Sequence, residues 1–248
     1  MAALPFQTDR GAGDHGTCGL IVLKPDETME VEFAPLFARA GVGLYHSRLP
    51  SAPDVSAASL AAMADEIPRA ASLLPDNKLQ TIGYGCTSGA TIIGSDRVEA
   101  MVRAHHPEVD TVTDPLRAAL AAFGHLGVRR IGFLTPYAPE VSGAMRQKFE
   151  AEGLVIAAFG SFEEPSEAAV ARISEASTEA ALIGLGRSPD VDAVFASCTN
   201  LRSFSIIESV ERTIGKPVVT SNQAFAWHLL SSLGRARAAK GPGRLFGS

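Results

Sequence analysis

The chain has 248 residues, of which 46% are hydrophobic and 20% charged, so it is able to bury a core and is not an intrinsically disordered chain. The formal net charge of −5 argues against nucleic acid as a partner, because phosphate binding needs a basic surface. No apolar run approaches the roughly 18 residues that span a membrane, and Met1–Gly16 lacks the apolar core of a secretion signal. We therefore expect a cytoplasmic protein that engages neither nucleic acid nor membranes.

In chain order, short apolar runs alternate with longer amphipathic segments. The predicted strands are Gly19–Lys24, Val42–Ser47, Gln80–Tyr84, Thr111–Thr113, Arg130–Thr135, Leu154–Phe159, Ala193–Ser197 and Pro217–Thr220. The predicted helices are Thr28–Arg39, Ser56–Leu74, Ser88–His105, Pro115–Leu126, Pro139–Glu152, Pro165–Leu185, Ser203–Ile214 and Gln223–Leu230. This alternation is typical of βαβ units and predicts an α/β fold with mainly parallel sheets flanked by helices. The basic tail, Gly234–Ser248, is expected to be a solvated end or a subunit contact.

Two segments of the chain resemble each other. Thr81-Ile-Gly-Tyr-Gly-Cys86-Thr87-Ser88 and Ala193-Val-Phe-Ala-Ser-Cys198-Thr199-Asn200 each read as an apolar strand that ends in Cys-Thr and leads into a helix. The repeat suggests two related α/β halves, each presenting a cysteine at the carboxyl end of a strand. Ligands bind at that end in open α/β sheets.

A thiol beside a helix N-terminus is expected to have a lowered pKa, because the free N–H groups and the helix dipole favour the thiolate. The hydroxyls of Thr87, Ser88 and Thr199, with nearby backbone N–H groups, would form a pocket for a carboxylate. One thiolate could then remove a proton while the other thiol returns one, or one could add to a conjugated double bond. The alternative is that the cysteines are buried small hydrophobic residues, and this is the interpretation that we favour for the third cysteine, Cys18. The odd cysteine count and the wide spacings support neither a disulfide framework nor a zinc site.

The sequence resembles the aspartate/glutamate racemase superfamily, in particular its maleate cis-trans isomerase branch. The resemblance rests on the two Cys-Thr motifs, on Ile21-Val22 with Thr28-Met29-Glu30, on Thr135-Pro136-Tyr137 and on Gly215-Lys216-Pro217-Val218. It implies two pseudo-symmetric domains, an active site between them, catalysis by Cys86 and Cys198, substrate binding by Tyr137, and no cofactor or metal. The implied domains are residues 17–114 with 219–248, and residues 115–218. A homodimer or homotetramer is also expected.

The chain departs from the maleate isomerases at two positions. Asp26, and less clearly Glu167, stand where those enzymes carry asparagines that contact a substrate carboxylate. An acidic side chain there favours a substrate with an amine or amide, although Asp26 could simply cap a helix and Glu167 could be a first-turn acid. Lys24–Thr28 and Ser221–Ala224 also resemble the ectoine-utilization relatives of this branch. Asn200 and Asn222 are further candidates for binding the substrate.

The sequence thus predicts a cofactor-independent isomerase or racemase that acts on a small carboxylic acid or amino-acid-like substrate, with a possible place in ectoine degradation. Two alternatives stay open. One is a non-catalytic protein that binds a metabolite in the same pocket. The other is a decarboxylase similar to arylmalonate decarboxylase, against which the presence of both Cys86 and Cys198 argues.

Overall fold

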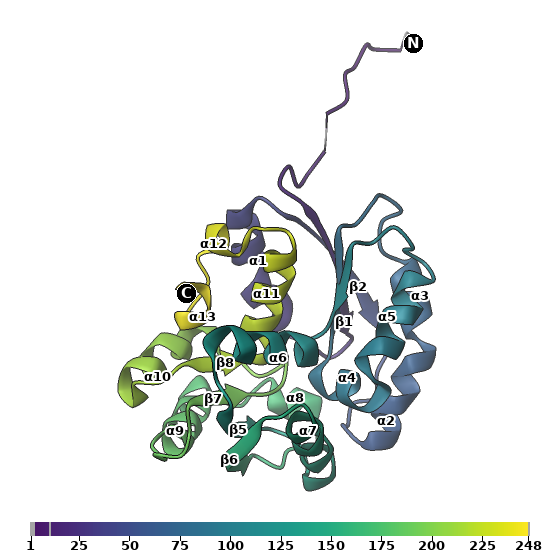
Figure 1. Cartoon of the computed structure of the whole chain (residues 1–248). Coiled ribbons are helices and arrows are strands. Elements are labelled where there is room, and N and C mark those ends of the chain that lie inside the picture. The colour runs from purple at the N-terminus through teal and green to yellow at the C-terminus, as the bar shows by residue number, and fades with distance from the viewer. Residues whose placement is uncertain (1–2, 10, 248) are drawn as a thin grey trace.

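The chain folds into two halves, each built on a four-stranded parallel sheet (Figure 1). The computed structural model describes residues 3–9 and 11–247. The first sheet has the order β2-β1-β3-β4 and the second has the equivalent order β6-β5-β7-β8. The strands are β1 (Thr17–Leu23), β2 (Gly43–Leu49), β3 (Thr81–Gly85), β4 (Thr111–Thr113), β5 (Arg130–Thr135), β6 (Val155–Ser161), β7 (Ala193–Ala196) and β8 (Val218–Thr220). The α/β class, the repeat of two halves and all eight expected strands are confirmed.

The helices cover both sheets. They are α1 (Met29–Ala40), α2 (Ala57–Ala62), α3 (Ile67–Ser72), α4 (Thr87–Ile93), α5 (Ser95–Arg103), α6 (Pro115–Leu126), α7 (Pro139–Ala151), α8 (Glu167–Val170), α9 (Glu175–Gly186), α10 (Ile207–Ile214), α11 (Ser221–Ser232), α12 (Ala236–Ala239) and α13 (Arg244–Gly247). Short 3-10 turns lie at Met63–Asp65 and Phe204–Ile206. The strands β3 and β7, which precede the two cysteines, are buried along their whole length, as expected for parallel strands covered on both faces.

Three of the long predicted helices are interrupted, so the sequence prediction was wrong there. Gly94 separates α4 from α5 with a φ of 92°, a conformation that glycine adopts without steric cost. Pro68 lies in the first turn of α3, where its missing N–H does not break a helical hydrogen bond. Ser174 starts α9 by accepting a hydrogen bond from the Ser177 N–H at 3.1 Å. These breaks leave α4 and α8 as short helices that each begin at the site described below.

The C-terminal segment packs on the rest of the chain, so a solvated tail was a wrong prediction. Leu245 is fully buried and Phe246 is 8% exposed. The Arg235 Nε donates to the Ala40 carbonyl at 3.0 Å, and the Arg244 N–H donates to the Glu211 carboxylate at 3.1 Å. Figure 1 shows this segment, in yellow, beside α1 and α10.

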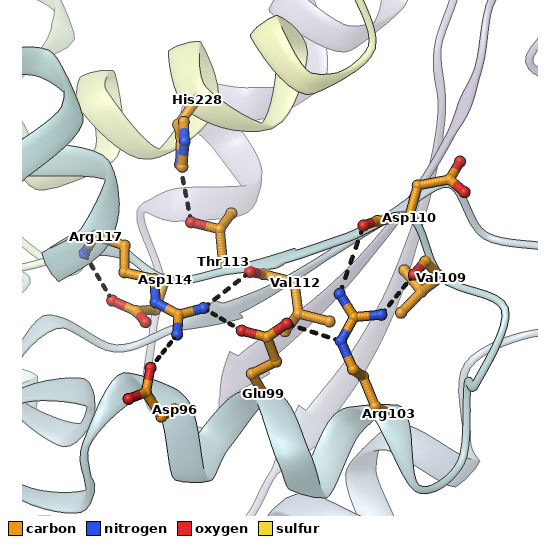
Figure 2. Close-up of polar contacts among 10 residues, drawn as sticks. All are labelled: Asp96, Glu99, Arg103, Val109, Asp110, Val112, Thr113, Asp114, Arg117 and His228. Carbon is orange, nitrogen blue, oxygen red and sulfur yellow. Dashed lines mark hydrogen bonds and ion pairs between the residues drawn. The ribbon is translucent and has the colours of Figure 1, made fainter.

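Helices α6 and α11 pack against each other and join the two halves (Figure 1). Polar contacts fix α6 to the first half, as Figure 2 shows. The Arg117 guanidinium on α6 pairs with Glu99 on α5 at 2.5 Å and donates to the Val112 carbonyl on β4 at 3.3 Å. Thr113 on β4 hydrogen-bonds to His228 on α11 at 2.9 Å. The last strand of the first sheet is therefore tied to both connecting helices.

Candidate active site

Cys86 and Cys198 occupy equivalent places in the two halves, each directly beyond the carboxyl end of a buried strand. Cys86 follows β3 and caps α4, because its Sγ accepts a hydrogen bond from the Gly89 N–H at 3.2 Å. Cys198 follows β7 with a φ of 144°, which is rare for a residue other than glycine, and its Sγ accepts from the Asn200 N–H at 3.4 Å. Such strained backbone is characteristic of functional sites. Each cysteine is only 4% exposed.

A single hydroxyl group links the two cysteine motifs. The Cys198 N–H donates to the Ser221 Oγ at 3.1 Å, and the same oxygen lies 2.8 Å from the Thr87 Oγ1, next to Cys86. Thr199 also reaches across, with its hydroxyl 3.5 Å from the Gly85 carbonyl oxygen. The two halves are therefore in direct contact at the cysteines.

Tyr137 lies beside both cysteines. It follows β5, and its backbone carbonyl is held by the Ser161 hydroxyl at 2.6 Å and the Ser142 hydroxyl at 3.0 Å. Burial raises the pKa of Tyr137 well above its usual value, and negative charge on Cys198, Glu167 or Cys86 would raise it further. The Tyr137 side chain in turn lowers the pKa of Cys198. The phenol is therefore neutral and able to donate a hydrogen bond to a thiolate or to a bound anion.

Two buried carboxylates face the same cysteines. Asp26, 4% exposed, accepts hydrogen bonds at its Oδ1 from the N–H groups of Thr28 at 2.9 Å and Met29 at 2.8 Å, so it holds the backbone at the start of α1, where Thr28 is the N-cap residue. Glu167, 7% exposed, starts α8 in the other half and accepts at its Oε2 from Asn200 at 3.1 Å. Burial raises the pKa of both carboxyl groups, and the charge of each carboxylate raises the pKa of both Cys86 and Cys198. Asp26 therefore both binds the backbone at the start of α1 and acts electrostatically on the two cysteines.

The resting thiols are protonated, contrary to the expected lowering of their pKa by a helix N-terminus. Burial raises the pKa of Cys86 to about 12 and that of Cys198 well above its usual value. Hydrogen bonds from Ser88 and the Gly89 N–H lower the pKa of Cys86. Burial and the charge of Glu167 raise it by more, so the net shift is upward. Desolvation therefore outweighs the helix dipole in the closed site.

The hydroxyls that the sequence singled out lie at the cysteines, whereas the two asparagines bind protein groups. The Ser88 Oγ is 3.6 Å from the Cys86 Sγ, and Thr87 and Thr199 make the cross-links given above. Asn200 uses its whole side chain: its Oδ1 accepts from the Glu27 N–H at 2.9 Å and its Nδ2 donates to the Glu167 carboxylate. Asn200 therefore ties the loop before α1 to α8.

Glu32 on α1 extends this network and has a pKa raised by burial to about 7. The Asn222 Nδ2 donates to the Glu32 Oε2 at 2.7 Å and to the Thr199 carbonyl at 2.8 Å. The other Glu32 oxygen accepts from the Ser203 N–H at 2.9 Å and the Phe204 N–H at 3.0 Å. Glu32 therefore holds Thr199 through the Asn222 amide. It also holds the backbone of Ser203 and Phe204 directly.

A backbone bridge joins the two halves next to Glu167. Asp54 and Ser166 form an isolated antiparallel bridge between the halves. The Val55 N–H donates to the Pro165 carbonyl at 2.9 Å, and the Glu167 N–H donates to the Pro53 carbonyl at 3.1 Å. The bridge holds Glu167 at the first half.

Within residues 3–9 and 11–247, no group of three or more His, Cys, Asp or Glu side chains is arranged to hold a metal ion. No helix in the same part of the chain is long and apolar enough to cross a membrane. The groups that the structure places at the site are two thiols, a phenol, hydroxyls and two carboxylates.

Residues 23–246 match the family described as Amdase, arylmalonate decarboxylase. The chain belongs to this family. Its curated relatives include maleate isomerases from Pseudomonas putida, 27% identical over 92% of this chain and 96% of the relative, and from Nocardia farcinica, 29% identical over 92% and 94%. The arylmalonate decarboxylase of Bordetella bronchiseptica is 33% identical over 52% of this chain and 55% of its own.

Solved structures of the family have the same fold. The Nocardia farcinica maleate cis-trans isomerase bound to TRIS is 27% identical, with a TM-score of 0.85 over 93% of this chain and 97% of its own. A cysteine-to-serine variant of that enzyme carries a covalently bound succinylcysteine intermediate, with 26% identity and a TM-score of 0.83 over 93% and 98%. The comparisons thus support the resemblance to maleate isomerases, while the resemblance to ectoine-utilization proteins stays a prediction.

The sequence does not predict two residues of this network. Ser221 stands in it only as part of a motif, although its place after Thr220, which caps α11, puts it at the end of a strand. Glu32 gave no signal, because an acid on a helix surface is ordinarily solvated. Its role depends on the loop after Cys198, which residue spacing does not locate.

Proposed function

We propose that the chain is a cofactor-independent isomerase or racemase in which Cys86 and Cys198 act together on a small carboxylic acid. The observation that supports the proposal most is that both thiols share one tyrosine and two carboxylates and are joined through Ser221. The curated relatives that span nearly the whole chain are isomerases, and one solved relative holds a covalent cysteine adduct.

The proposed site binds one substrate carboxylate through the hydroxyls of Thr87 and Ser88 and the N–H groups that open α4. For cis-trans isomerisation, one thiolate adds to the double bond and the other thiol protonates the neighbouring carbon, which gives a saturated thioether. Rotation about the new single bond, return of that proton to the second sulfur and expulsion of the first thiolate give the trans alkene. For racemisation, one thiolate removes the α-proton and the other thiol delivers a proton to the opposite face.

In either reaction Tyr137 is proposed to stabilise negative charge. Its neutral phenol lowers the pKa of Cys198, so it is placed to favour the thiolate of that residue when the substrate reacts. Thr199 is proposed to complete the anion pocket. Asn200 and Asn222 are proposed to hold the pocket in shape, since their amide groups bind Glu167, Glu32 and the Thr199 carbonyl.

The test is exchange of solvent deuterium into candidate acids and amino acids, with maleate-to-fumarate conversion measured in parallel. Exchange or isomerisation should disappear in Cys86→Ser and in Cys198→Ser. The control Cys18→Ala removes a fully buried thiol of β1 and should keep the activity. Ligand affinity without exchange would support a metabolite-binding protein instead, and release of CO₂ from a malonate would support a decarboxylase.

We further propose that two domains surround this site, one formed by residues 17–114 with 219–248 and the other by residues 115–218. We also propose that the protein works in the cytoplasm and that it forms a homodimer or homotetramer. Three free cysteines suit a reducing compartment. Val155 and Phe159 on the edge strand β6, 48% and 39% exposed, favour a subunit contact. The resemblance of Lys24–Thr28 and Ser221–Ala224 to ectoine-utilization relatives supports a role in ectoine degradation. Light scattering of the purified protein tests the oligomer.

A further inference from the structure

We propose that Asp26 and Glu167 form a subsite for a cationic nitrogen, so that the substrate carries an ammonium group at the end opposite its carboxylate. The proposal rests on the proposed function in one respect, that the substrate lies between the two cysteines. It extends that function by naming the charge of the substrate. The argument has three steps.

The first step is an unsatisfied oxygen. The Asp26 Oδ1 accepts from the N–H groups of Thr28 and Met29, whereas its buried Oδ2 accepts no hydrogen bond from the described residues. The nearby Thr199 hydroxyl lowers the pKa of Asp26 but donates to the Gly85 carbonyl. Nearly every buried carboxylate oxygen in a native protein is satisfied, because an oxygen without a partner keeps the full cost of leaving water. A helix cap alone needs only the first oxygen. The second therefore lacks a partner that a ligand would provide.

The second step is an unbalanced charge. Glu167 approaches from the other half, and the charge of Asp26 raises its pKa. Neither carboxylate forms an ion pair with a lysine or arginine in the part of the chain that the structure describes. Arg48 is the cation that acts on Asp26, and it is already engaged: it pairs with Glu30 and donates to the carbonyls of Leu23, Lys24 and Asp26. Two carboxylates thus share a buried region without a counter-ion.

The third step is the position of this charge. Both carboxylates act electrostatically on both cysteines, and Glu167 acts also on Tyr137. An ammonium group between them would neutralise the repulsion that opposes thiolate formation at Cys86 and Cys198. A second substrate carboxylate would add to that repulsion. The substrate that completes this site therefore activates the thiols, whereas a dicarboxylate does not.

Two four-carbon ligands of opposite charge at one end provide the test. In 4-aminobutyrate the ammonium nitrogen stands where maleate has a carboxylate oxygen. Binding is measured by calorimetry at pH 7.5 on the full chain carrying Cys86→Ser and Cys198→Ser, so that no turnover occurs. We expect 4-aminobutyrate to bind at least tenfold more tightly than maleate. Asp26→Asn and Glu167→Gln, each added to this chain, should reverse the preference by at least tenfold.

A matched control separates charge recognition from loss of a helix cap. Asp114 is 1% exposed and caps α6 with the same pair of bonds, to the N–H groups of Leu116 at 2.9 Å and Arg117 at 3.0 Å. Asp114→Asn should leave the ratio of the two affinities unchanged. Glu167→Gln keeps the α1 cap intact, so the test survives if Asp26→Asn fails to fold.

The proposal is overturned if maleate binds more tightly than 4-aminobutyrate, if neither acid-to-amide change alters the ratio, or if 4-aminobutyrate does not bind at all. Its failure is distinguishable from failure of the proposed function. Cysteine-dependent isomerisation of maleate would retain the two-thiol chemistry and reject the cationic subsite. Binding of 4-aminobutyrate that depends on Asp26, without deuterium exchange in the wild-type enzyme, would retain the subsite and reject the isomerase.

Discussion

The hydroxyls of Thr87 and Ser221 lie 2.8 Å apart at the meeting point of the two halves. Both side chains are fully buried; Thr87 belongs to the Cys86 motif, and Ser221 begins α11. Because the Ser221 Oγ also accepts the Cys198 N–H, a movement of α4 is transmitted to the backbone of Cys198. The Ser221 hydroxyl therefore helps to set the relative position of the two cysteine motifs, together with the contact of Thr199 with the Gly85 carbonyl.

Replacing that hydroxyl should lower both stability and activity. Ser221→Ala leaves the buried Cys198 N–H without an acceptor and the Thr87 hydroxyl without its partner, which we expect to cost about 1–3 kcal/mol. The turnover number should fall more than the Michaelis constant rises, since the cysteine is misplaced while the anion pocket remains. Urea unfolding and steady-state kinetics measure the two effects. The control is Ser232→Ala on the same helix, whose hydroxyl only caps the Leu229 carbonyl.

Removing the Tyr137 hydroxyl should slow the reaction without unfolding the protein. Tyr137→Phe keeps the buried ring and deletes the hydroxyl that lowers the pKa of Cys198. We expect a loss of about 10²-fold or more in turnover, as for other removed donors to a developing charge, and a stability change of about 1 kcal/mol. Tyr45→Phe, whose hydroxyl makes only a 3.5 Å contact with Ala12, is the control. An active Tyr137→Phe enzyme would contradict the assigned role.

The three thiols should be unreactive in the folded, ligand-free protein. With a pKa of about 12, the Cys86 thiol is ionised to only about one part in ten thousand at pH 8. Cys18 and Cys198 are equally buried and have pKa values raised by the same cause. A disulfide reagent should therefore titrate no thiol rapidly at pH 8 and three after denaturation. Rapid labelling of a native thiol would show that the site opens readily.

Protonation of Glu32 should make stability fall as the pH rises. Burial raises the pKa of its carboxyl from 4.5 to about 7 in the folded chain, so the folded state holds an extra proton between these values. The corresponding stabilisation, on the order of 3 kcal/mol before solvent screening, is fully present below pH 4.5 and is lost as the pH passes through about 7. Glu32→Gln should flatten this part of the stability curve. Equal pH slopes in the two proteins, measured by denaturant unfolding from pH 5 to 8.5, would refute the assignment.

The sequence predicted the strands and the two cysteine positions because both follow from short-range patterns. Each buried parallel strand is a run of apolar residues, and the repeat of Cys-Thr at the ends of β3 and β7 locates the site without knowledge of the packing. The placement of Cys86 and Cys198 beside one tyrosine needed the structure or a resemblance, since Tyr137 comes from a third strand end.

What the sequence did not predict depends on burial. The predicted lowering of the cysteine pKa was wrong, because the residue spacing around Cys86 does not show that the start of α4 is buried away from solvent. The two functions of Asp26 could not be separated, because a capping acid and an acid that lines a site have the same neighbours in sequence. The packed C-terminal segment was missed because Leu245 and Phe246 are isolated among basic and small residues.

The bridge between Asp54 and Ser166 makes the contact between the two halves measurable by hydrogen exchange. Its two hydrogen bonds belong to the backbone, so the amide protons of Val55 and Glu167 are protected only while the halves are bridged. Their exchange rates report the frequency with which this bridge between the halves opens. A bound ligand that touches Glu167 should slow both amides together, even though one belongs to each half.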